Sequence, residues 1–129
     1  MSSDVSVTTR IPVVRMVMFP RDTNQLGSIF GGHILSLIDI AAGQHARHVA
    51  VHRYVTKVLR EVEFISPVYV GDTVSLYTRT LRKGTSSITI EVEVDAQRGT
   101  DALQTLRVTT AEVVMVAIDD RGRPIPIDP

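Results

Sequence analysis

Strict alternation of side chains near the middle of the chain is the feature that most limits its fold. Within residues 88–95 the apolar side chains are Ile88, Ile90, Val92 and Val94, and the polar ones between them are Thr89, Glu91, Glu93 and Asp95. Successive side chains of a strand point to opposite faces of a sheet, so this pattern predicts a strand with one face in the core and the other in water. Such a strand needs partner strands to bury its apolar face.

Four further segments carry weaker strand signals. They are residues 12–18, 57–64, 73–82 and 106–118, with turn-forming residues between them. Residues 113–118 are apolar at consecutive positions, which predicts a strand covered on both faces. Charged residues and a glycine in the segment 82–85 predict that the strands before and after it form a hairpin.

One segment, residues 31–51, has apolar residues at helical spacing, which predicts a helix about 30 Å long. Gly43 in its interior lowers helix propensity, so another backbone is expected to approach the helix closely there. The order of one strand, one helix and then four strands predicts an α+β domain, with an antiparallel sheet wrapped around one long central helix. We assign residues 11–129 to this single domain and residues 1–10 to a flexible N-terminus. One sheet cannot cover both the helix and its own remaining apolar surface, so at least a dimer is expected.

An acid interrupts the apolar pattern of this helix. Asp39 shares a helical row with Leu35, Ala42 and Ala46, which predicts that its carboxylate points toward the packed side. Burying a carboxylate is costly unless it finds a partner, and acids in such places concentrate at functional sites. The alternative is a structural acid, paired with a basic side chain or hydrogen-bonded to a nearby turn.

Composition narrows the class of protein. The 129 residues include 14 Lys and Arg, 14 Asp and Glu, and no cysteine. Zero net charge argues against nucleic acid or an anionic membrane as a partner. Without cysteine there is no disulfide, thiolate metal site or thiol nucleophile, and the N-terminal residues lack a signal peptide's apolar region. We expect a cytoplasmic protein.

Short motifs along most of the chain resemble one known family. In chain order they are Phe19-Pro20, Asp22-Thr23-Asn24, Ile29-Phe30-Gly31-Gly32, Asp39, Phe64 with Pro67, Val70-Gly71-Asp72, Gly84 with Ser86-Ser87, Val108-Thr109, Val116-Ala117, and Asp119 with Gly122-Arg123-Pro124. Their order and spacing resemble the hotdog-fold acyl-CoA thioesterases of the acyl-CoA hydrolase family, in particular the small bacterial short-chain type. The resemblance implies thioester hydrolysis at the interface of a homodimer, further assembly as a trimer of dimers, and no cofactor, since coenzyme A is part of substrate and product.

The resemblance also implies catalytic roles for Asp39, Asn24, Gly31 and Gly32. Asp39 would activate water or attack the carbonyl directly, and both routes stay open. The backbone N–H groups of Gly31 and Gly32, at the start of the helix, would face the developing oxyanion. Asn24 would orient the water or the thioester from the other protomer. From the residues alone, the glycines could be an ordinary turn and Asn24 an Asx turn.

Substrate binding is expected at two further places. In the hairpin, the resemblance assigns Gly84, Ser86 and Ser87 to the nucleotide end of coenzyme A, and charge and hydroxyl groups add Arg82, Lys83 and Thr85. The alternative is a solvated turn. Around the acyl site we include Phe30, His33, Val58 and Arg60, with Arg60 expected on the inward parity of its strand, within reach of Asp39, and His33 expected chiefly to pack.

Two other classes of function compete with thioester hydrolysis. A hotdog hydratase or dehydratase needs an acid and a histidine acting as a pair, and His45, His48 and His52 lie well past Asp39. A non-catalytic module that binds acyl-CoA would tolerate loss of the Asp39 carboxylate. The same three histidines have no matching carboxylate in the sequence, so we predict a solvated helix face and no metal site.

Overall fold

The computed structural model describes residues 10–99 and 104–129. Its elements are β1 (Val14–Val17), the 3₁₀ helix η1 (Pro20–Asp22), α2 (Gly31–Val49), β2 (Arg53–Phe64), β3 (Thr73–Lys83), β4 (Ser87–Arg98) and β5 (Gln104–Ile118). The predicted order of one strand, one long helix and four strands is confirmed. The short helix η1 was not predicted. Of the N-terminal segment, residues 1–9 lie outside the described residues.

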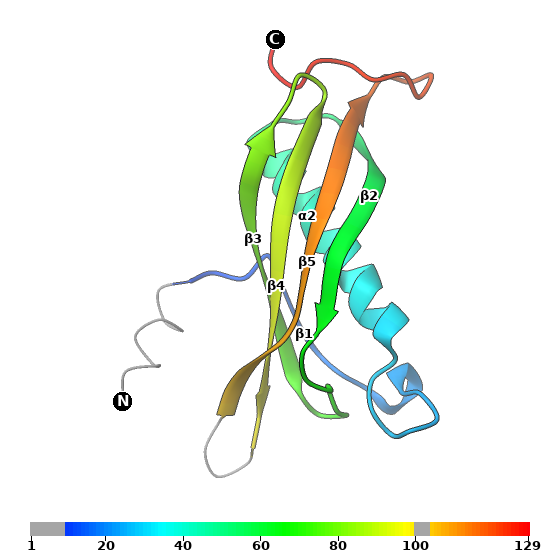
Figure 1. Cartoon of the computed structure of the whole chain (residues 1–129), viewed down its shortest axis with the longest axis vertical. Helices are drawn as coiled ribbons and strands as arrows, with labels where there is room; N and C mark the ends of the chain where they lie inside the picture. The colour runs from blue at the N-terminus through cyan, green and yellow to red at the C-terminus, as the bar shows by residue number, and fades with distance from the viewer. Residues whose placement is uncertain (1–9, 100–103) are drawn as a thin grey trace.

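The strands form one antiparallel sheet in the order β1-β3-β4-β5-β2 (Figure 1). Helix α2 lies against one face of this sheet, behind the strands in the view of Figure 1. The predicted architecture, an antiparallel sheet wrapped around one helix, is therefore confirmed. Strands β1 and β2 are the two edges of the sheet. Within the described chain, no helix is both long and apolar enough to cross a lipid bilayer.

The core lies between α2 and the inner face of the sheet. Its fully buried members include Ile34, Ile38, Ala42, Ile88, Ile90, Val92, Val94 and Val113. The alternation in residues 88–95 therefore marks the inner and outer faces of β4 as predicted. On β5, Val114 and Val116 of the outer face are only 8% exposed, so this strand is covered on both sides, also as predicted.

Strand β2 is irregular at two places. Its pairing with β5 shifts in register between Thr56 and Val58 and again between Arg60 and Glu63. Within the second irregularity Glu61 has a φ of 54°, a left-handed conformation that costs a non-glycine residue about 1 kcal/mol. Each shift changes which face the following side chains occupy, so simple alternation cannot assign the faces of this strand.

Gly43 has a different environment from the one predicted. A Cβ atom built at Gly43 would meet only the side-chain Cε of Met115, at 3.8 Å. No neighbouring backbone of the described chain approaches it within that range, so the predicted close backbone contact is wrong for the single chain. The space beside Gly43 instead belongs to a cavity between α2 and β2.

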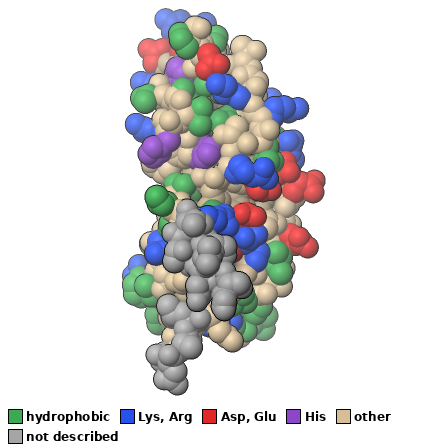
Figure 2. All heavy atoms as spheres, turned by 90° about the vertical axis from the view of Figure 1, so that its left-hand side faces the viewer, with side chains coloured by type: hydrophobic (Ala, Val, Ile, Leu, Met, Phe, Trp, Pro, Cys, Tyr) green, Lys and Arg blue, Asp and Glu red, His purple; other side chains and the backbone are tan. Residues whose placement is uncertain are grey.

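The outer face of the sheet carries ion pairs. Arg79 pairs with Glu91, Arg107 with Glu93 and Asp95, Arg60 with Glu112, and Arg10 with Glu93. Figure 2, viewed from the left of Figure 1, shows basic and acidic side chains next to one another along the right of the molecule. Arg10, expected in the flexible terminus, also lies over the Tyr77 ring at 3.9 Å.

Candidate functional site

Asp39 lies where the buried and exposed faces of α2 meet. Ala42 and Ala46 of the same helical row are fully buried, whereas Asp39 is exposed. The predicted orientation toward the packed side is therefore wrong for the single chain, because the sheet covers the helix only as far as its edge strand β2. From that strand, Thr56 Oγ1 donates a 2.5 Å hydrogen bond to Asp39 Oδ1.

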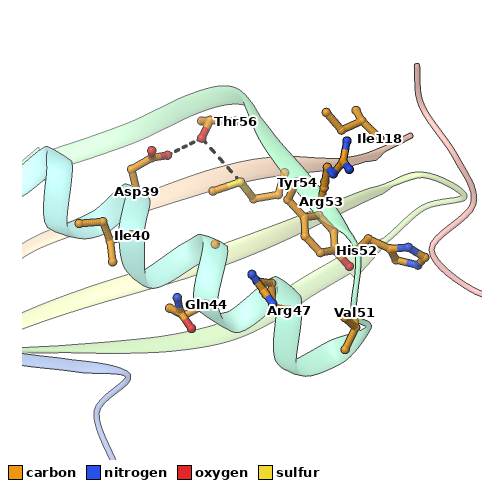
Figure 3. Close-up of a pocket in the computed structure, with 12 residues that line it drawn as sticks. Asp39, Ile40, Gln44, Arg47, Val51, His52, Arg53, Tyr54, Thr56 and Ile118 are labelled. Atoms are coloured by element: carbon orange, nitrogen blue, oxygen red, sulfur yellow. Dashed lines mark hydrogen bonds between the residues drawn. The ribbon is translucent and has the colours of Figure 1, made fainter. Parts of the chain in front are cut away.

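A cavity of about 730 Å³ opens beside Asp39, between the C-terminal half of α2 and the start of β2. Figure 3 shows Asp39 and Thr56 at one end of it and Arg47 and Arg53 toward the other. Its volume lies within the range of roughly 300–1,000 Å³ that is common for small-molecule sites. Because only one oxygen of Asp39 is bonded to Thr56, the second is available to a molecule bound there.

Gly31 and Gly32 form the first turn of α2, as predicted. No side chain caps this end, and among the described residues no acceptor is bonded to the N–H groups of Gly31 or Gly32. A Cβ atom at Gly32 would lie 2.4 Å from the ring of Phe30, and one at Gly31 would lie 3.4 Å from Phe64. Two unpaired donors at a positive helix end can accept an anion or a developing oxyanion.

A second hollow, of about 290 Å³, lies beneath Gly31. Its wall is largely apolar and includes Ile34, Phe64 and Ile65. The hydroxyl of Thr109 also belongs to it, and Thr109 Oγ1 is buried without a hydrogen-bond partner. The helix start thus borders an apolar space large enough for a small acyl group.

Asn24 organises the loop that precedes α2. Its Oδ1 accepts hydrogen bonds from the N–H groups of Leu26 at 2.8 Å and Ser28 at 3.2 Å, and its Nδ2 donates to Ser28 Oγ at 3.0 Å. The first of these hydrogen bonds forms an Asx turn, the structural alternative for Asn24. One hydrogen of Nδ2 is still free to donate, so a role in orienting substrate stays a prediction.

Phe30 and His33 lie beside the glycine pair. Phe30 is 58% exposed, and its ring lies over Gly32. His33 Nε2 is buried without a hydrogen-bond partner and lies 3.7 Å from Asp22 Oδ2. Asp22 also accepts a hydrogen bond from the N–H of Phe19, which orders the turn before the helix. His33 therefore faces the loop and not Asp39.

The predicted hairpin is present, with Gly84, Thr85 and Ser86 between β3 and β4. The N–H of Gly84 donates to the carbonyl of Ser87 at 2.8 Å. Lys83 Nζ forms an ion pair with Asp128 of the C-terminal tail at 3.0 Å, so its charge is partly neutralised within the chain.

The C-terminal tail joins this hairpin to the cavity. Ile127 N–H donates to the carbonyl of Thr85, and Ile127 O accepts from His52 Nε2, both at 2.8 Å. His52 lines the cavity that contains Asp39. Nothing on the described hairpin touches Asp39, and binding roles for Arg82, Gly84, Thr85, Ser86 and Ser87 stay predictions.

Arg60 and Val58 do not join Asp39. Arg60 is exposed, and its Nε lies 3.2 Å from Glu112 Oε1 on the neighbouring strand. Its predicted inward orientation is wrong, because the register shift after Thr56 exchanges the two faces of β2. Val58 is half-buried and lies outside the lining of the cavity.

The histidines of α2 have separate structural partners. His45 contacts the hydroxyls of Thr78 and Thr80 on β3, and His48 Nδ1 lies 2.8 Å from the carbonyl of Gln44. Burial, and to a smaller extent the nearby His48, lowers the pKa of His45. Among the described residues, no three His, Asp or Glu side chains gather closely enough to hold a metal ion.

Apart from Asp39, the residues that line the cavity were not predicted as site residues from sequence, Thr56, Arg47 and Arg53 among them. In the sequence, the two arginines are cations near the end of the helix, a pattern typical of a solvated helix end. Thr56 had no distinguishing signal, because its contact with Asp39 joins a helix to a strand 17 positions away. Such a pair becomes visible only when the register of the helix on the sheet is known.

Comparison with known proteins identifies the family. The model of the Thioesterase superfamily matches residues 26–103. The acyl-CoA thioester hydrolase YciA of Escherichia coli K12 is 36% identical over 126 residues, which cover 93% of this chain and 96% of YciA. A hexameric hotdog fold thioesterase of Campylobacter jejuni superposes with a TM-score of 0.87 at 40% identity, covering 91% of this chain and 90% of that one. A second solved structure is an aspartate-to-alanine variant of a hexameric broad specificity acyl-coenzyme A thioesterase. It superposes with a TM-score of 0.88 at 36% identity, covering 92% of this chain and 86% of that one. The chain therefore belongs to the thioesterase superfamily and has the hotdog fold.

Proposed function

We propose that this protein hydrolyses acyl-CoA thioesters to free coenzyme A and a carboxylic acid. The observation that carries the proposal is the Asp39 carboxylate, held by Thr56 at the edge of a substrate-sized cavity, in a chain of this family. The reaction needs water and no cofactor. The cytoplasmic location expected from the cysteine-free sequence belongs to the same proposal.

The chemistry follows from the groups present. The free oxygen of Asp39 takes a proton from a water molecule, whose oxygen attacks the thioester carbon. Alternatively the free oxygen of Asp39 attacks the thioester carbon itself, and the carbon–sulfur bond breaks to give a mixed anhydride and the thiolate of coenzyme A. Water then hydrolyses the anhydride. In both routes the backbone N–H groups at Gly31 and Gly32 stabilise the oxyanion. In the first route the carbon–sulfur bond breaks after the attack of water, and the thiolate of coenzyme A takes up the proton held by Asp39. In the second route the thiolate takes up a proton from the water that hydrolyses the anhydride.

Two copies of the chain form each site in this proposal. Asp39 and Gly32 of one chain are seven positions apart on α2, about 10 Å at the rise of an α-helix, and Asp39 is exposed in the single chain. The acid and the oxyanion donors at one thioester then come from different copies of the chain.

Strand β2 supplies the surface for the second copy. It is an edge strand, and Val55 and Leu59 on it are 45% and 37% exposed. Exposed apolar edges promote pairing with another strand. Thr56, near the start of β2, contacts Asp39, whereas Phe64, at the other end of β2, lies beside Gly31. Antiparallel pairing of two β2 strands about a two-fold axis would place Asp39 of one copy beside Gly31 and Gly32 of the other.

The acyl group then enters the hollow beneath Gly31 of the second copy. A homodimer is the smallest unit with complete sites, and it would have two of them. Because the relatives from Campylobacter jejuni and the broad specificity enzyme are hexameric, we propose a trimer of such dimers. Light scattering at several protein concentrations tests the assembly.

A turnover assay with acyl-CoAs of increasing chain length, in which a thiol reagent detects free coenzyme A, tests the function. The parent protein should release thiol, and Asp39→Asn should lower kcat by about 100-fold or more while the protein still binds coenzyme A. Calorimetry provides the binding measurement. If the parent cleaves no acyl-CoA, or if the variant cleaves at the parent's rate, the proposed function is wrong.

A further inference from the structure

The cavity beside Asp39 has chemically different ends. Asp39 and Thr56 lie at one end, and the guanidinium groups of Arg47 on α2 and Arg53 on β2 lie toward the other (Figure 3). Between the two ends the wall is mainly uncharged and includes Gly43, Tyr54 and Met115. A ligand that fits this cavity has a reactive group, a neutral middle part and an anion.

Both arginines are available to bind an anion. Neither Arg47 nor Arg53 has a carboxylate within 4.0 Å among the described residues, although seven other arginines of the chain do. Both are exposed, and no hydrogen bond within the described chain occupies their side chains. A guanidinium group binds phosphate oxygens through two parallel hydrogen bonds, which suits it to this task.

The spacing of the two ends matches the arm of coenzyme A. Asp39 and Arg47 are eight residues apart on α2, about 12 Å along the helix axis. Thr56 and Arg53 are three residues apart on β2, about 10 Å along the strand. The pantetheine arm, from sulfur to the first phosphorus, extends to about 15 Å at ordinary bond lengths, and the arginine side chains themselves reach a few ångströms beyond the backbone.

We propose that Arg47 and Arg53 bind the diphosphate of the acyl-CoA substrate, with the pantetheine arm lying along the cavity toward Asp39. This inference rests on the proposed function and assigns the phosphate site to residues outside the hairpin. It agrees with the neutralisation of Lys83 by Asp128. It also agrees with the position of the hairpin, which Ile127 joins to His52 at the same end of the cavity, so the adenosine would extend toward Thr85.

Substrates with and without the diphosphate test the proposal. Arg47→Gln and Arg53→Gln are assayed with an acyl-CoA and with the same acyl group on pantetheine or N-acetylcysteamine. Each substitution should raise KM for the acyl-CoA about tenfold, the loss of one charge-assisted contact. KM for the truncated thioesters and kcat for all substrates should stay close to the parent's. Arg47→Lys and Arg53→Lys keep the charge and should recover part of the effect.

Arg121 provides a matched control. It is exposed on the turn after β5 and lies outside the cavity lining, so Arg121→Gln removes the same charge and should leave KM unchanged. Higher ionic strength should raise the parent's KM for acyl-CoA more than for the truncated thioesters, a measurement that needs no variant.

Two outcomes would overturn the assignment. In the first, the glutamine substitutions raise KM for acyl-CoA and for the truncated thioesters equally, or they change neither value. In the second, they raise KM only for substrates whose acyl group ends in a carboxylate, on coenzyme A and on N-acetylcysteamine alike. The arginines would then bind the acyl group and not the diphosphate. Absence of all thioester cleavage by the parent would instead contradict the proposed function, and direct titration with coenzyme A and pantetheine would still test the arginines.

Discussion

Thr56 Oγ1 donates a hydrogen bond of 2.5 Å to Asp39 Oδ1 and so joins the edge strand β2 to the middle of α2. This contact holds one oxygen of a carboxylate that is otherwise exposed. A carboxylate held in one orientation gives a higher rate than a freely rotating one, because the reacting groups must meet in a narrow range of geometries. The strand therefore orients the acid while the helix supplies it.

Replacing Thr56 by valine tests this orienting role. Valine has nearly the same shape and lacks the donor, so Asp39 becomes free to rotate, and we expect kcat to fall by about tenfold with little change in KM. Thr56→Ser keeps the hydroxyl and should retain most of the activity. Steady-state kinetics on a short-chain acyl-CoA provides the measurement, and equal turnover by the valine variant and the parent would show that Asp39 needs no such support.

Mixing two inactive variants tests whether the site is shared between copies. Asp39→Asn removes the acid, and Asn24→Asp removes the amide donor while keeping the oxygen that accepts from Leu26 and Ser28. Each variant alone should be nearly inactive. If Asp39 and Asn24 meet from different copies, random co-assembly gives half mixed dimers with one intact site each, and activity returns to about a quarter of the parent's.

The experiment distinguishes a site shared between copies from a site within one chain, because the two arrangements predict different activities for the mixture. If Asp39 and Asn24 of the same chain formed the site, every chain in the mixture would be defective and no activity would return. Co-expression with two affinity tags isolates assemblies that contain both variants. In a trimer of randomly formed dimers about half of the dimers are mixed, so the activity of these assemblies should remain about a quarter of the parent's.

The buried hydroxyl of Thr109 is expected to lower the stability of the fold. Its side chain is 1% exposed, and Oγ1 is buried without a hydrogen-bond partner beside the hollow under Gly31. An unsatisfied buried hydroxyl costs about 1–3 kcal/mol. Thr109→Val, of nearly equal volume, should therefore raise the free energy of unfolding by about 1 kcal/mol, measured by urea denaturation at one fixed protein concentration.

Thr110 provides the matched control for this substitution. It is the next residue on β5 and is half-buried, so Thr110→Val relieves no buried hydroxyl and should change stability by less than about 0.5 kcal/mol. A loss of stability in Thr109→Val would mean that its hydroxyl has a partner, such as a buried water.

Periodicity predicted those parts of the fold that depend on one element at a time. The alternation from Ile88 to Val94 located the inner face of β4, since every apolar residue there is fully buried. The faces of β2 could not be predicted, because its register shifts arise from pairing with β5 and not from its own sequence. The prediction for Arg60 failed for this reason.

The candidate site was predictable in its residue types and not in its contacts. Asp39 stood out as an acid in an apolar pattern, and Gly31 and Gly32 as the start of a helix. The exposure of Asp39 depends on where the sheet ends, and its contact with Thr56 depends on how the helix lies on that edge. Arg47 and Arg53 resembled ordinary surface cations until the cavity placed them together.

The protonation of His45 should make the free energy of unfolding depend on pH. Its two ring nitrogens lie 2.8 Å from Thr78 Oγ1 and 2.7 Å from Thr80 Oγ1. Burial is the larger cause and the nearby His48 the smaller cause of a pKa below the ordinary value of 6.5 for His45. The folded protein therefore binds this proton less tightly than the unfolded chain does. The contribution of His45 to stability is complete above pH 6.5 and is lost as the pH falls from there to the lowered pKa.

His45→Gln removes this titration and keeps a side chain that can contact one threonine. Between about pH 7.5 and pH 5.5 the free energy of unfolding should fall less in this variant than in the parent, because the unfolded variant has no proton to gain at this position. His48→Gln, at an exposed position with a local contact, should resemble the parent much more closely. Urea unfolding at each pH provides the slopes. If the free energy of unfolding changes with pH identically in His45→Gln and the parent, the folded and unfolded chains bind the proton of His45 equally well. The contacts of His45 with Thr78 and Thr80 would then be insensitive to pH.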